Sequence, residues 1–136
     1  MKAIKTISGL EEIYQKYEIF ILDQWGVMHN GENAYKHAIQ CVDKLYSNKK
    51  ILTIISNSSK RKESTTARLP SLGFKKNLFQ NVMTSGEMIW QSLFNQNYEE
   101  TIGLGRNFFY IYDETKEDGK NYIKGLEKFN IVNNIE

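Results

Sequence analysis

Short apolar runs alternate with longer amphipathic stretches along the chain. The runs EIFIL (residues 18–22) and KILTIIS (residues 50–56) carry few polar interruptions. This is typical of strands in a parallel sheet whose two faces are both covered. Between the runs, residues 34–48 repeat apolar side chains at helical spacing, namely Ala38, Ile39, Val42, Leu45 and Tyr46. A strand, a helix and a second strand in this order predict a βαβ unit.

The alternation continues beyond the second strand. A helical stretch reaches Leu69 and stops at Pro70, because proline has no N–H to donate and its ring clashes with the preceding turn. Residues 81–84 predict a third strand, and Ser85 with Gly86 a break. The next helix has one apolar face, formed by Met88, Ile89, Leu93 and Phe94. Together these elements predict an α/β fold with a mainly parallel sheet and helices on both of its faces.

The two ends of the chain are predicted separately. Ser8 can cap a first helix, Glu11 stands at the capping-box position, and an apolar stripe follows, made of Leu10, Ile13, Tyr14 and Tyr17. Towards the other end, residues 107–112 predict a strand, residues 119–129 a helix, and the last residues the start of one more strand. Because the chain stops on or just after a strand, we expect it to be the N-terminal half of a larger fold.

Composition narrows the class of protein. The 136 residues are enough for one domain with a real core. Eighteen basic and sixteen acidic residues leave a net charge of +2, and the lysines are spread out, so no nucleic-acid partner is expected. No apolar run approaches the roughly 18 residues of a membrane span, and the N-terminus lacks a signal peptide's apolar stretch. We therefore expect a cytoplasmic protein without a membrane partner, with the single Cys41 buried in a helix.

Polar residues follow each predicted strand at its carboxyl end, where ligands of parallel sheets gather. The first strand delivers Asp23 and Gly26, the second the row Ser56, Asn57, Ser58 and Ser59, and the third the row Thr84, Ser85, Gly86 and Glu87. A carboxylate facing hydroxyls, an amide and helix N-termini predicts an oxyanion or phosphate site.

Each of these residues also has a simpler interpretation. Asp23 can serve as a nucleophile or a Mg²⁺ ligand, or it is only a turn or cap residue after the strand. The Ser/Asn row can bind a ligand or cap the helix that follows it. Gly26 would let the backbone approach a ligand closely.

Three motifs resemble those of the haloacid dehalogenase superfamily. They are Asp23-Gln24-Trp25-Gly26-Val27 with Gly31 behind it, then TIISNSSK, then VMTSGE. The closest resemblance is to the class IIA branch, which contains the para-nitrophenyl-phosphatase and N-acetylglucosamine-phosphatase-like enzymes. It covers residues 20 to about 95.

The resemblance implies a Rossmann-like core that hydrolyses a small phosphorylated substrate with the help of Mg²⁺. Asp23 would be the nucleophile, forming an aspartyl-phosphate, and would also bind the metal. Ser56 would hold the phosphoryl oxygens, and Asn57, Ser58 and Gly26 would line the same cradle. Residues 1–105 would form a partial core and residues 106–136 the start of a cap. The open sheet would then associate with a missing C-terminal half or with a second copy.

The chain departs from the family pattern at one position of the first motif. Trp25 stands where the family places a second acid, and an indole cannot act as a general acid and base. Trp25 would instead pack under the loop or stack on a flat substrate. His29 is either a surrogate acid or an ordinary loop residue, and the run Lys60–Lys62 either adds charge to the site or faces solvent. The alternatives to an enzyme are a catalytically inactive remnant or split half, and a non-catalytic module that binds a phosphorylated ligand or a protein.

Overall fold

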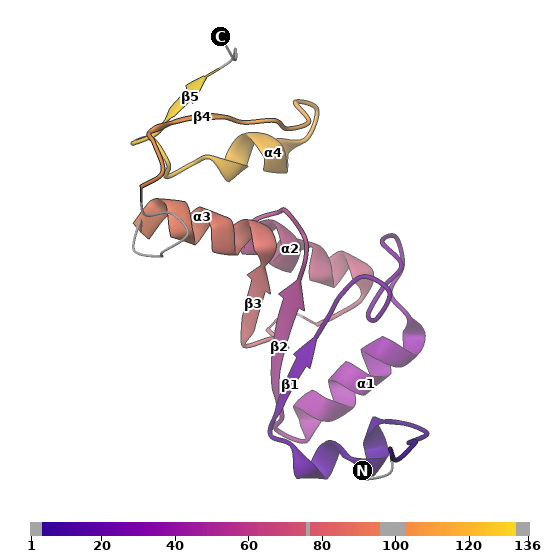
Figure 1. Ribbon diagram of the computed structural model, residues 1–136. Coiled ribbons are helices and arrows are strands. Elements are labelled where there is room, and N and C mark those ends of the chain that lie inside the picture. The colour runs from indigo at the N-terminus through magenta and orange to yellow at the C-terminus, as the bar shows by residue number, and fades with distance from the viewer. Residues whose placement is uncertain (1–3, 76, 96–102, 133–136) are drawn as a thin grey trace. The chain divides into compact units, whose positions relative to one another are not determined.

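Strands and helices alternate along the computed structural model, which describes residues 4–75, 77–95 and 103–132 (Figure 1). The strands are β1 (Ile19–Leu22), β2 (Ile51–Ser56), β3 (Asn81–Thr84), β4 (Asn107–Phe109) and β5 (Asn130–Val132). The α-helices are α1 (Lys36–Ser47), α2 (Lys62–Arg68), α3 (Ser85–Asn95) and α4 (Glu117–Tyr122). The 3₁₀-helices are η1 (Leu10–Glu12), η2 (Tyr14–Lys16) and η3 (Leu69–Leu72). The chain divides into two compact units. The first unit consists of Met1–Ser56 and Ala67–Val82, and the second unit consists of Asn57–Thr66 and Met83–Glu136.

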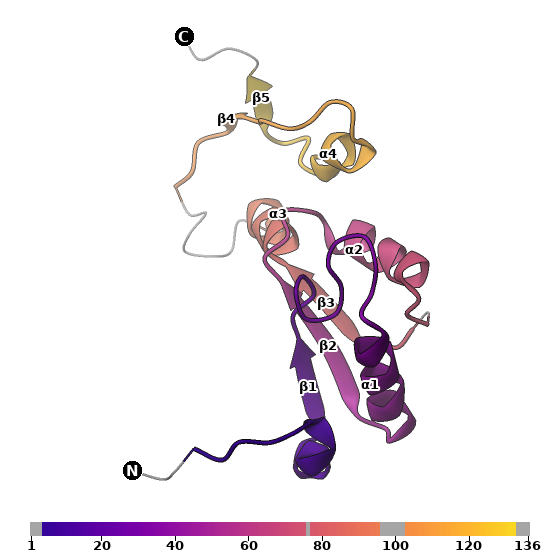
Figure 2. The same cartoon turned by 90° about the vertical axis from the view of Figure 1, so that its right-hand side faces the viewer.

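The first unit is built on a parallel β1-α1-β2 crossover. β1 and β2 pair in parallel with Ile19 opposite Ile51 and Leu22 opposite Ile54. The sheet order is β1-β2-β3, with β2 in the centre (Figure 2). The predicted α/β class with a parallel sheet is therefore confirmed.

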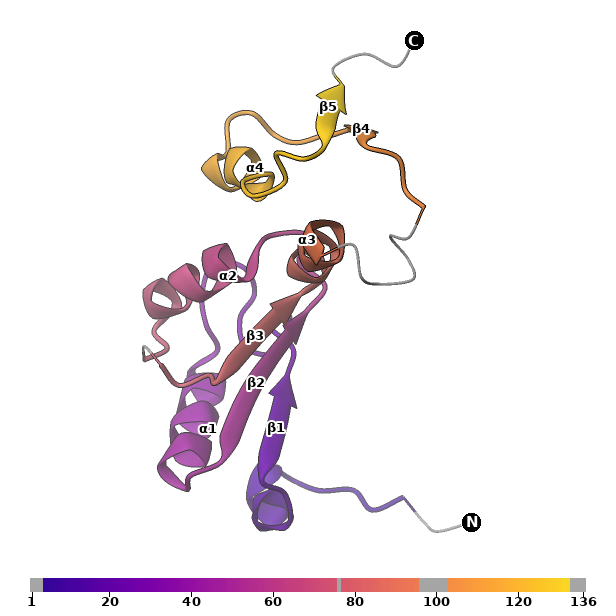
Figure 3. The same ribbon diagram turned by 90° about the vertical axis from the view of Figure 1, so that its left-hand side faces the viewer.

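The core of the first unit lies between α1 and one face of the sheet (Figure 3). Phe20, Leu52 and Ile54 point from the strands towards it, and Val42 and Leu45 enter it from α1. The remaining buried members are Met28, Leu69, Leu72, Phe74 and Leu78. Cys41 is half-buried beside this core, and its burial raises the pKa of the thiol. The helical pattern of residues 34–48 thus identified the buried face of α1 correctly.

The opposite face of β1 and β2 is uncovered within the described residues. Ile19, Ile21, Ile51 and Ile55 alternate with the core residues and are 56%, 63%, 38% and 51% exposed. We call these four side chains the isoleucine face. The expectation that both faces of these strands would be covered is therefore met on one face only, because α1 packs on the other.

The predicted N-terminal helix is wrong in detail. Residues 10–16 form two 3₁₀ turns, η1 and η2, instead of one α-helix. The N–H and the hydroxyl of Ser8 both donate to Glu12 Oε1, at 2.7 Å each, so Glu12 rather than Glu11 is the acid that Ser8 contacts. The shift by one residue arises because Gly9, and not Ser8, occupies the N-cap position.

Most other element boundaries lie close to those predicted. α2 ends at Arg68 and η3 contains Pro70, and Gly73 ends it with a φ of +95°. α3 begins at Ser85, directly after β3, so the predicted break at Ser85 and Gly86 is absent. β4 and α4 are shorter than predicted.

The second unit contains a two-stranded parallel sheet. β4 pairs with β5, with Phe108 opposite Ile131. Phe129 is buried, and its ring meets that of Phe108 edge to face at 5.5 Å. Trp90 Nε1 of α3 donates to the carbonyl oxygen of Lys124 at 3.0 Å, which ties α3 to the segment between α4 and β5. Across the described residues, no helix has the length and apolar character needed to cross a membrane.

Polar contacts join the start of α3 to residues 58–60. Thr84 caps α3 by accepting a hydrogen bond from the N–H of Glu87 at 3.0 Å, and its hydroxyl donates to the carbonyl oxygen of Lys60 at 2.5 Å. A Cβ on Gly86 would lie 2.0 Å from the carbonyl oxygen of Ser59. Only glycine permits this close approach of the two backbone segments.

A buried ion pair stabilises the same region. Glu87 is 1% exposed, and its Oε2 accepts a hydrogen bond from Arg61 Nε at 2.6 Å. Gln91 Nε2 and the N–H of Lys62 also donate to this carboxylate. Burial by itself raises the pKa of Glu87, but these hydrogen bonds and the charge of Arg61 outweigh it, so the pKa is lowered.

The basic run at residues 60–62 is therefore not simply a solvent-facing helix start. The Arg61 guanidinium lies 3.7 Å from the centroid of the Trp90 ring, and its side chain is only 19% exposed. Lys60 Nζ pairs with Asp118 Oδ2 at 2.5 Å. These charges are used in packing within the second unit.

Matched substitutions on the two sheet faces test the burial pattern. Ile54→Val removes a methyl group from the core and should lower the free energy of unfolding by about 0.5–1.5 kcal/mol. Ile21→Val makes the same change on the isoleucine face and should cost less than about 0.5 kcal/mol. Urea unfolding followed by circular dichroism measures both. Equal losses would show that the isoleucine face is covered in solution.

Removing the charge of Glu87 tests the buried ion pair. Glu87→Gln leaves Arg61 without its counter-charge and should lower the free energy of unfolding at pH 7 by about 1–3 kcal/mol. Because the folded pKa of Glu87 lies below its unfolded value, the charge stabilises the fold above the unfolded pKa of about 4.3. That contribution is lost as the pH falls through the folded pKa.

The difference between native chain and variant should therefore shrink below about pH 4. Glu63→Gln is the matched control, because Glu63 is mostly exposed and lies 3.8 Å from Arg61 Nη2. Its cost should stay below about 0.5 kcal/mol. A Glu87→Gln effect that is the same at pH 7 and pH 3 would contradict the role of charge.

Candidate active site at the carboxyl ends of β1 and β2

Asp23 lies directly after β1 and its side chain is exposed. Its Oδ1 accepts a hydrogen bond from the N–H of Gln24 at 2.8 Å. Ser56 ends the neighbouring strand β2 and is buried. Because β1 and β2 are parallel and Leu22 pairs with Ile54, Asp23 and Ser56 emerge at the same edge of the sheet. The structure therefore brings the predicted nucleophile and the predicted phosphate-binding hydroxyl to one edge.

Asn57 and Ser58 follow β2 but belong to the second unit. Asn57 is exposed, and Ser58 is half-buried. Ser58 Oγ accepts a hydrogen bond from the N–H of Lys60 at 3.2 Å, and the carbonyl oxygen of Ser58 accepts one from the N–H of Gly86. Because α2 begins only at Lys62, the contact with Lys60 belongs to the turn before the helix and is not a helix cap. The place of both residues in a phosphate cradle stays a prediction.

The loop after Asp23 is held by backbone hydrogen bonds to one carbonyl. The oxygen of Gln24 accepts from the N–H groups of Val27, Met28 and His29 at 3.2, 2.8 and 3.2 Å. Gln24, Met28 and His29 are buried, whereas the residues between them are exposed. The loop is therefore anchored from inside and presents its other side chains outward.

Gly26 has a conformational reason to be glycine. Its φ is +82°, in the left-handed region that side chains disfavour. No atom lies within 4 Å of the place that a Cβ would take, and the N–H of Gly26 donates to the carbonyl oxygen of His29 at 2.8 Å. The backbone at Gly26 is thus open to close approach, as a ligand-facing position requires.

Trp25 stands at the position of the missing acid and is 67% exposed. The far edge of its indole packs on Gly31, since a Cβ on Gly31 would lie 2.4 Å from Trp25 Cη2. Gly31 is buried with a φ of +102°, and Arg68 Nη2 donates to its carbonyl oxygen. Trp25 is therefore held at one edge while most of its ring remains outside the core.

His29 is a structural member of this loop. It is 5% exposed, and its Nδ1 accepts a hydrogen bond from the N–H of Gly31 at 3.0 Å. Burial lowers the pKa of His29, the charge of Arg68 lowers it further, and Asp23 opposes them. Because the Nδ1 of this buried ring already accepts a hydrogen bond from the backbone, the geometry favours the loop role for His29.

The capacity for Mg²⁺ depends on the carboxylates at this edge. Mg²⁺ at phosphate sites is commonly held by one or two carboxylates, water and the substrate's own phosphate. Asp23 fits as one such ligand. Within residues 4–75, 77–95 and 103–132, no group of three or more His, Cys, Asp or Glu side chains is placed to hold a metal. Asp23 is therefore the candidate Mg²⁺ ligand at this edge.

The third predicted row has a structural role in the second unit. Thr84 caps α3, Gly86 allows close backbone contact and Glu87 binds Arg61. The sequence interpretation missed this ion pair because its partners lie 26 residues apart and no local pattern links them.

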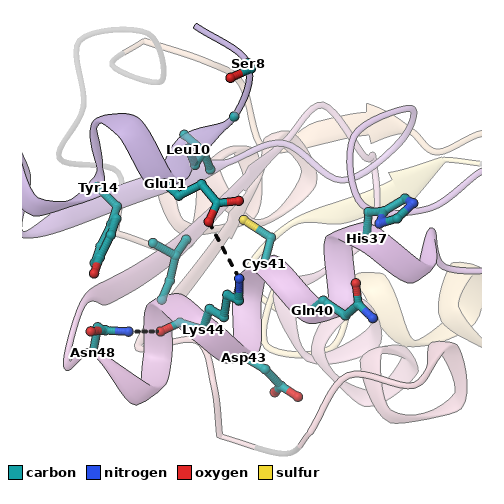
Figure 4. A pocket seen from close by; sticks show the side chains of 12 residues that line it. Ser8, Leu10, Glu11, Tyr14, His37, Gln40, Cys41, Asp43, Lys44 and Asn48 are labelled. Atoms are coloured by element: carbon teal, nitrogen blue, oxygen red, sulfur yellow. Dashed lines mark hydrogen bonds and ion pairs between the residues drawn. The ribbon is translucent and has the colours of Figure 1, made fainter.

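A cleft of about 940 Å³ lies elsewhere in the first unit, between the N-terminal turns and α1 (Figure 4). Lys44 Nζ and Glu11 Oε2 face each other there at 3.8 Å, and Asn48 Nδ2 donates to the carbonyl oxygen of Lys44 at 2.8 Å. None of the predicted site residues lines this cleft. The candidate chemistry is therefore at the Asp23 edge.

Two solved structures are similar to this chain in fold. Among solved structures, the chain is similar to a hydrolase of the haloacid dehalogenase-like family from Brucella suis 1330, with a TM-score of 0.69 and 24% identity. That match covers 93% of this chain and 42% of the other. A hypothetical protein from Pyrococcus horikoshii OT3 has a TM-score of 0.54 and 19% identity, over 82% of this chain and 39% of the other. No curated protein matches the chain.

The two structural matches show the fold, and the chain spans less than half the length of either protein. Membership of a family is shown by the match to a family model. Residues 20–126 match the family model for haloacid dehalogenase-like hydrolases. The matched stretch contains most of β1, all of β2 and the loop that carries Asp23. This match extends over well more than half of the chain, which therefore belongs to the haloacid dehalogenase-like hydrolase family.

Proposed function

We propose that the chain supplies the nucleophile and part of the phosphate site of a Mg²⁺-dependent phosphatase of the class IIA branch, acting on a small phosphorylated molecule. The observation that carries this proposal is the exposed Asp23 at the end of β1 beside the buried Ser56 at the end of β2. A carboxylate at such an edge is placed to attack a phosphoryl group that neighbouring hydroxyl and N–H groups orient.

The chemistry at Asp23 takes two steps. A carboxylate oxygen forms a bond to phosphorus while the bond from phosphorus to the ester oxygen breaks, and the leaving group departs with that electron pair. Water then hydrolyses the aspartyl-phosphate, releasing phosphate and restoring Asp23. Ser56, with Asn57, Ser58 and the open backbone of Gly26, would orient the phosphoryl oxygens. Mg²⁺, held by Asp23 and the phosphate, would neutralise charge on the transferring group.

Protonation of the leaving group is the step that differs from the family pattern. Trp25 has no proton to give near neutral pH, and His29 is buried with its Nδ1 accepting a hydrogen bond from the N–H of Gly31. The leaving oxygen would therefore depart without a proton from either residue. The second candidate function is therefore a non-catalytic module that binds a phosphorylated ligand. A catalytically inactive remnant or split half is the other alternative.

The same proposal includes the domain division, the cellular location and the partner of the chain. The proposed division has a partial core in residues 1–105 and the start of a cap in residues 106–136. We propose a cytoplasmic protein whose partner at the isoleucine face is a further part of the fold or a second copy. Each of the four isoleucines is more than one third exposed, which supports a partner there.

Asp23→Asn tests the nucleophile. The amide keeps the shape of the side chain but cannot form the aspartyl-phosphate. Mg²⁺-dependent hydrolysis of para-nitrophenyl phosphate should therefore fall by about 10⁴-fold or more. Circular dichroism checks that the variant is folded. Asp43→Asn, the same change at a residue of α1 that pairs with Lys75, is the matched control and should leave turnover unchanged. Native turnover in Asp23→Asn would remove this residue from the mechanism. Phosphate binding without turnover in the native chain would favour the binding module.

Trp25→Asp tests whether only the acid is missing. A carboxylic acid at this position can protonate the leaving oxygen and then activate water, so turnover of an alkyl phosphate should rise by about 10²- to 10⁴-fold. The gain should be smaller for para-nitrophenyl phosphate, whose leaving group needs no proton. A folded variant that gains nothing on the alkyl ester would count against the phosphatase geometry.

A further inference from the structure

Trp25 combines three properties that are seldom found together in a loop residue. Its indole is large and apolar, it is 67% exposed, and it is fixed at one edge by contact with Gly31. An exposed tryptophan costs the fold the burial that such a ring would otherwise gain. Its position next to the candidate nucleophile suggests a use for the exposed ring.

The ring is held from several directions. The backbone at Trp25 forms a bridge with His29, and the N–H of Gly26 closes the turn on the carbonyl oxygen of His29. The His29 ring meets the indole edge to face, with 6.2 Å between centroids. Gly31 is fixed in turn by His29 Nδ1 and by Arg68. The indole is thus positioned before any ligand arrives, so little side-chain freedom is lost on binding.

The distance to the nucleophile limits what the ring can contact. Trp25 lies two positions after Asp23 in the chain, and two residues span at most about 7 Å of backbone. A phosphoryl group bound at Asp23 therefore places its ester oxygen and the first atoms of its leaving group within reach of the indole. Only a ring close to the phosphate can stack there.

We infer that Trp25 is a specificity-determining residue that selects phosphate monoesters with a flat aromatic ring next to the ester oxygen. The inference rests on the proposed function and names the class of its substrate. Stacking of a flat ring on the indole supplies binding energy in the place where the family pattern has an acid.

The chemistry of the leaving group supports the same class. A phenol has a pKa of about 10, far below the pKa of water and of aliphatic hydroxyl groups. An aromatic leaving group can therefore depart as its anion, without the proton that neither Trp25 nor His29 supplies. The residue that removes general acid catalysis would thus be the one that selects substrates able to react without it.

Binding of two matched phosphonates to the full chain tests the inference without any need for turnover. Benzylphosphonate and cyclohexylmethylphosphonate carry the same charge and rings of similar size, but only the first ring is flat. Isothermal titration calorimetry should give a dissociation constant about tenfold lower for benzylphosphonate. Trp25→Leu should abolish the preference and Trp25→Phe should retain most of it, while Val27→Ala, an exposed apolar change in the same loop, should leave it unchanged.

The outcomes separate the inference from the proposed function. Equal affinity for the two phosphonates in the native chain overturns the inference while the phosphate site stands. A preference that survives Trp25→Leu also overturns it. A preference that depends on Trp25, in a chain without turnover, supports the inference and rejects the catalytic step. No binding of either phosphonate overturns both.

Discussion

Parallel pairing of β1 with β2 is the constraint on which the candidate site depends. The pairing is held by a layer of apolar side chains, in which Phe20 and Leu52 pack against Val42 and Leu45 of α1. Each such side chain contributes roughly 1.5–3 kcal/mol when it leaves water. With the two strands fixed in parallel, their carboxyl ends meet at one edge, and Asp23 and Ser56 emerge there. In an antiparallel pair the hydroxyl would lie at the opposite end of the strand from the carboxylate.

The loop after β1 turns this strand geometry into a surface that can bind a ligand. Buried Met28 and His29 and the carbonyl of Gln24 fix its path, so the exposed Asp23 and Trp25 are not on a freely moving segment. The same hydrogen bond that makes His29 a loop anchor takes its Nδ1 out of any proton transfer. A rigid site and a weakened acid–base function thus have one structural cause.

Polar residues at the ends of strands have competing uses, and geometry decides between them. Thr84 offers a hydroxyl like that of Ser56 and Glu87 a carboxylate like that of Asp23, yet both hold the start of α3 against residues 58–61. Arg61 is positioned between the Glu87 carboxylate and the Trp90 ring, which removes its charge from solvent. The second unit therefore uses charge for packing where the first unit leaves a charge exposed.

The order of strands and helices, the buried face of α1 and the position of Asp23 at a strand end were determined by the sequence alone. These follow from local apolar periodicity and from short-range backbone rules, which one chain carries in full. The 3₁₀ geometry of residues 10–16, the pairing of Arg61 with Glu87, the burial of His29 and the contact of Trp25 with Gly31 were decided only by the tertiary structure. Each depends on which residues come into contact in the folded chain, and the local spacing of residues along the sequence does not specify these contacts.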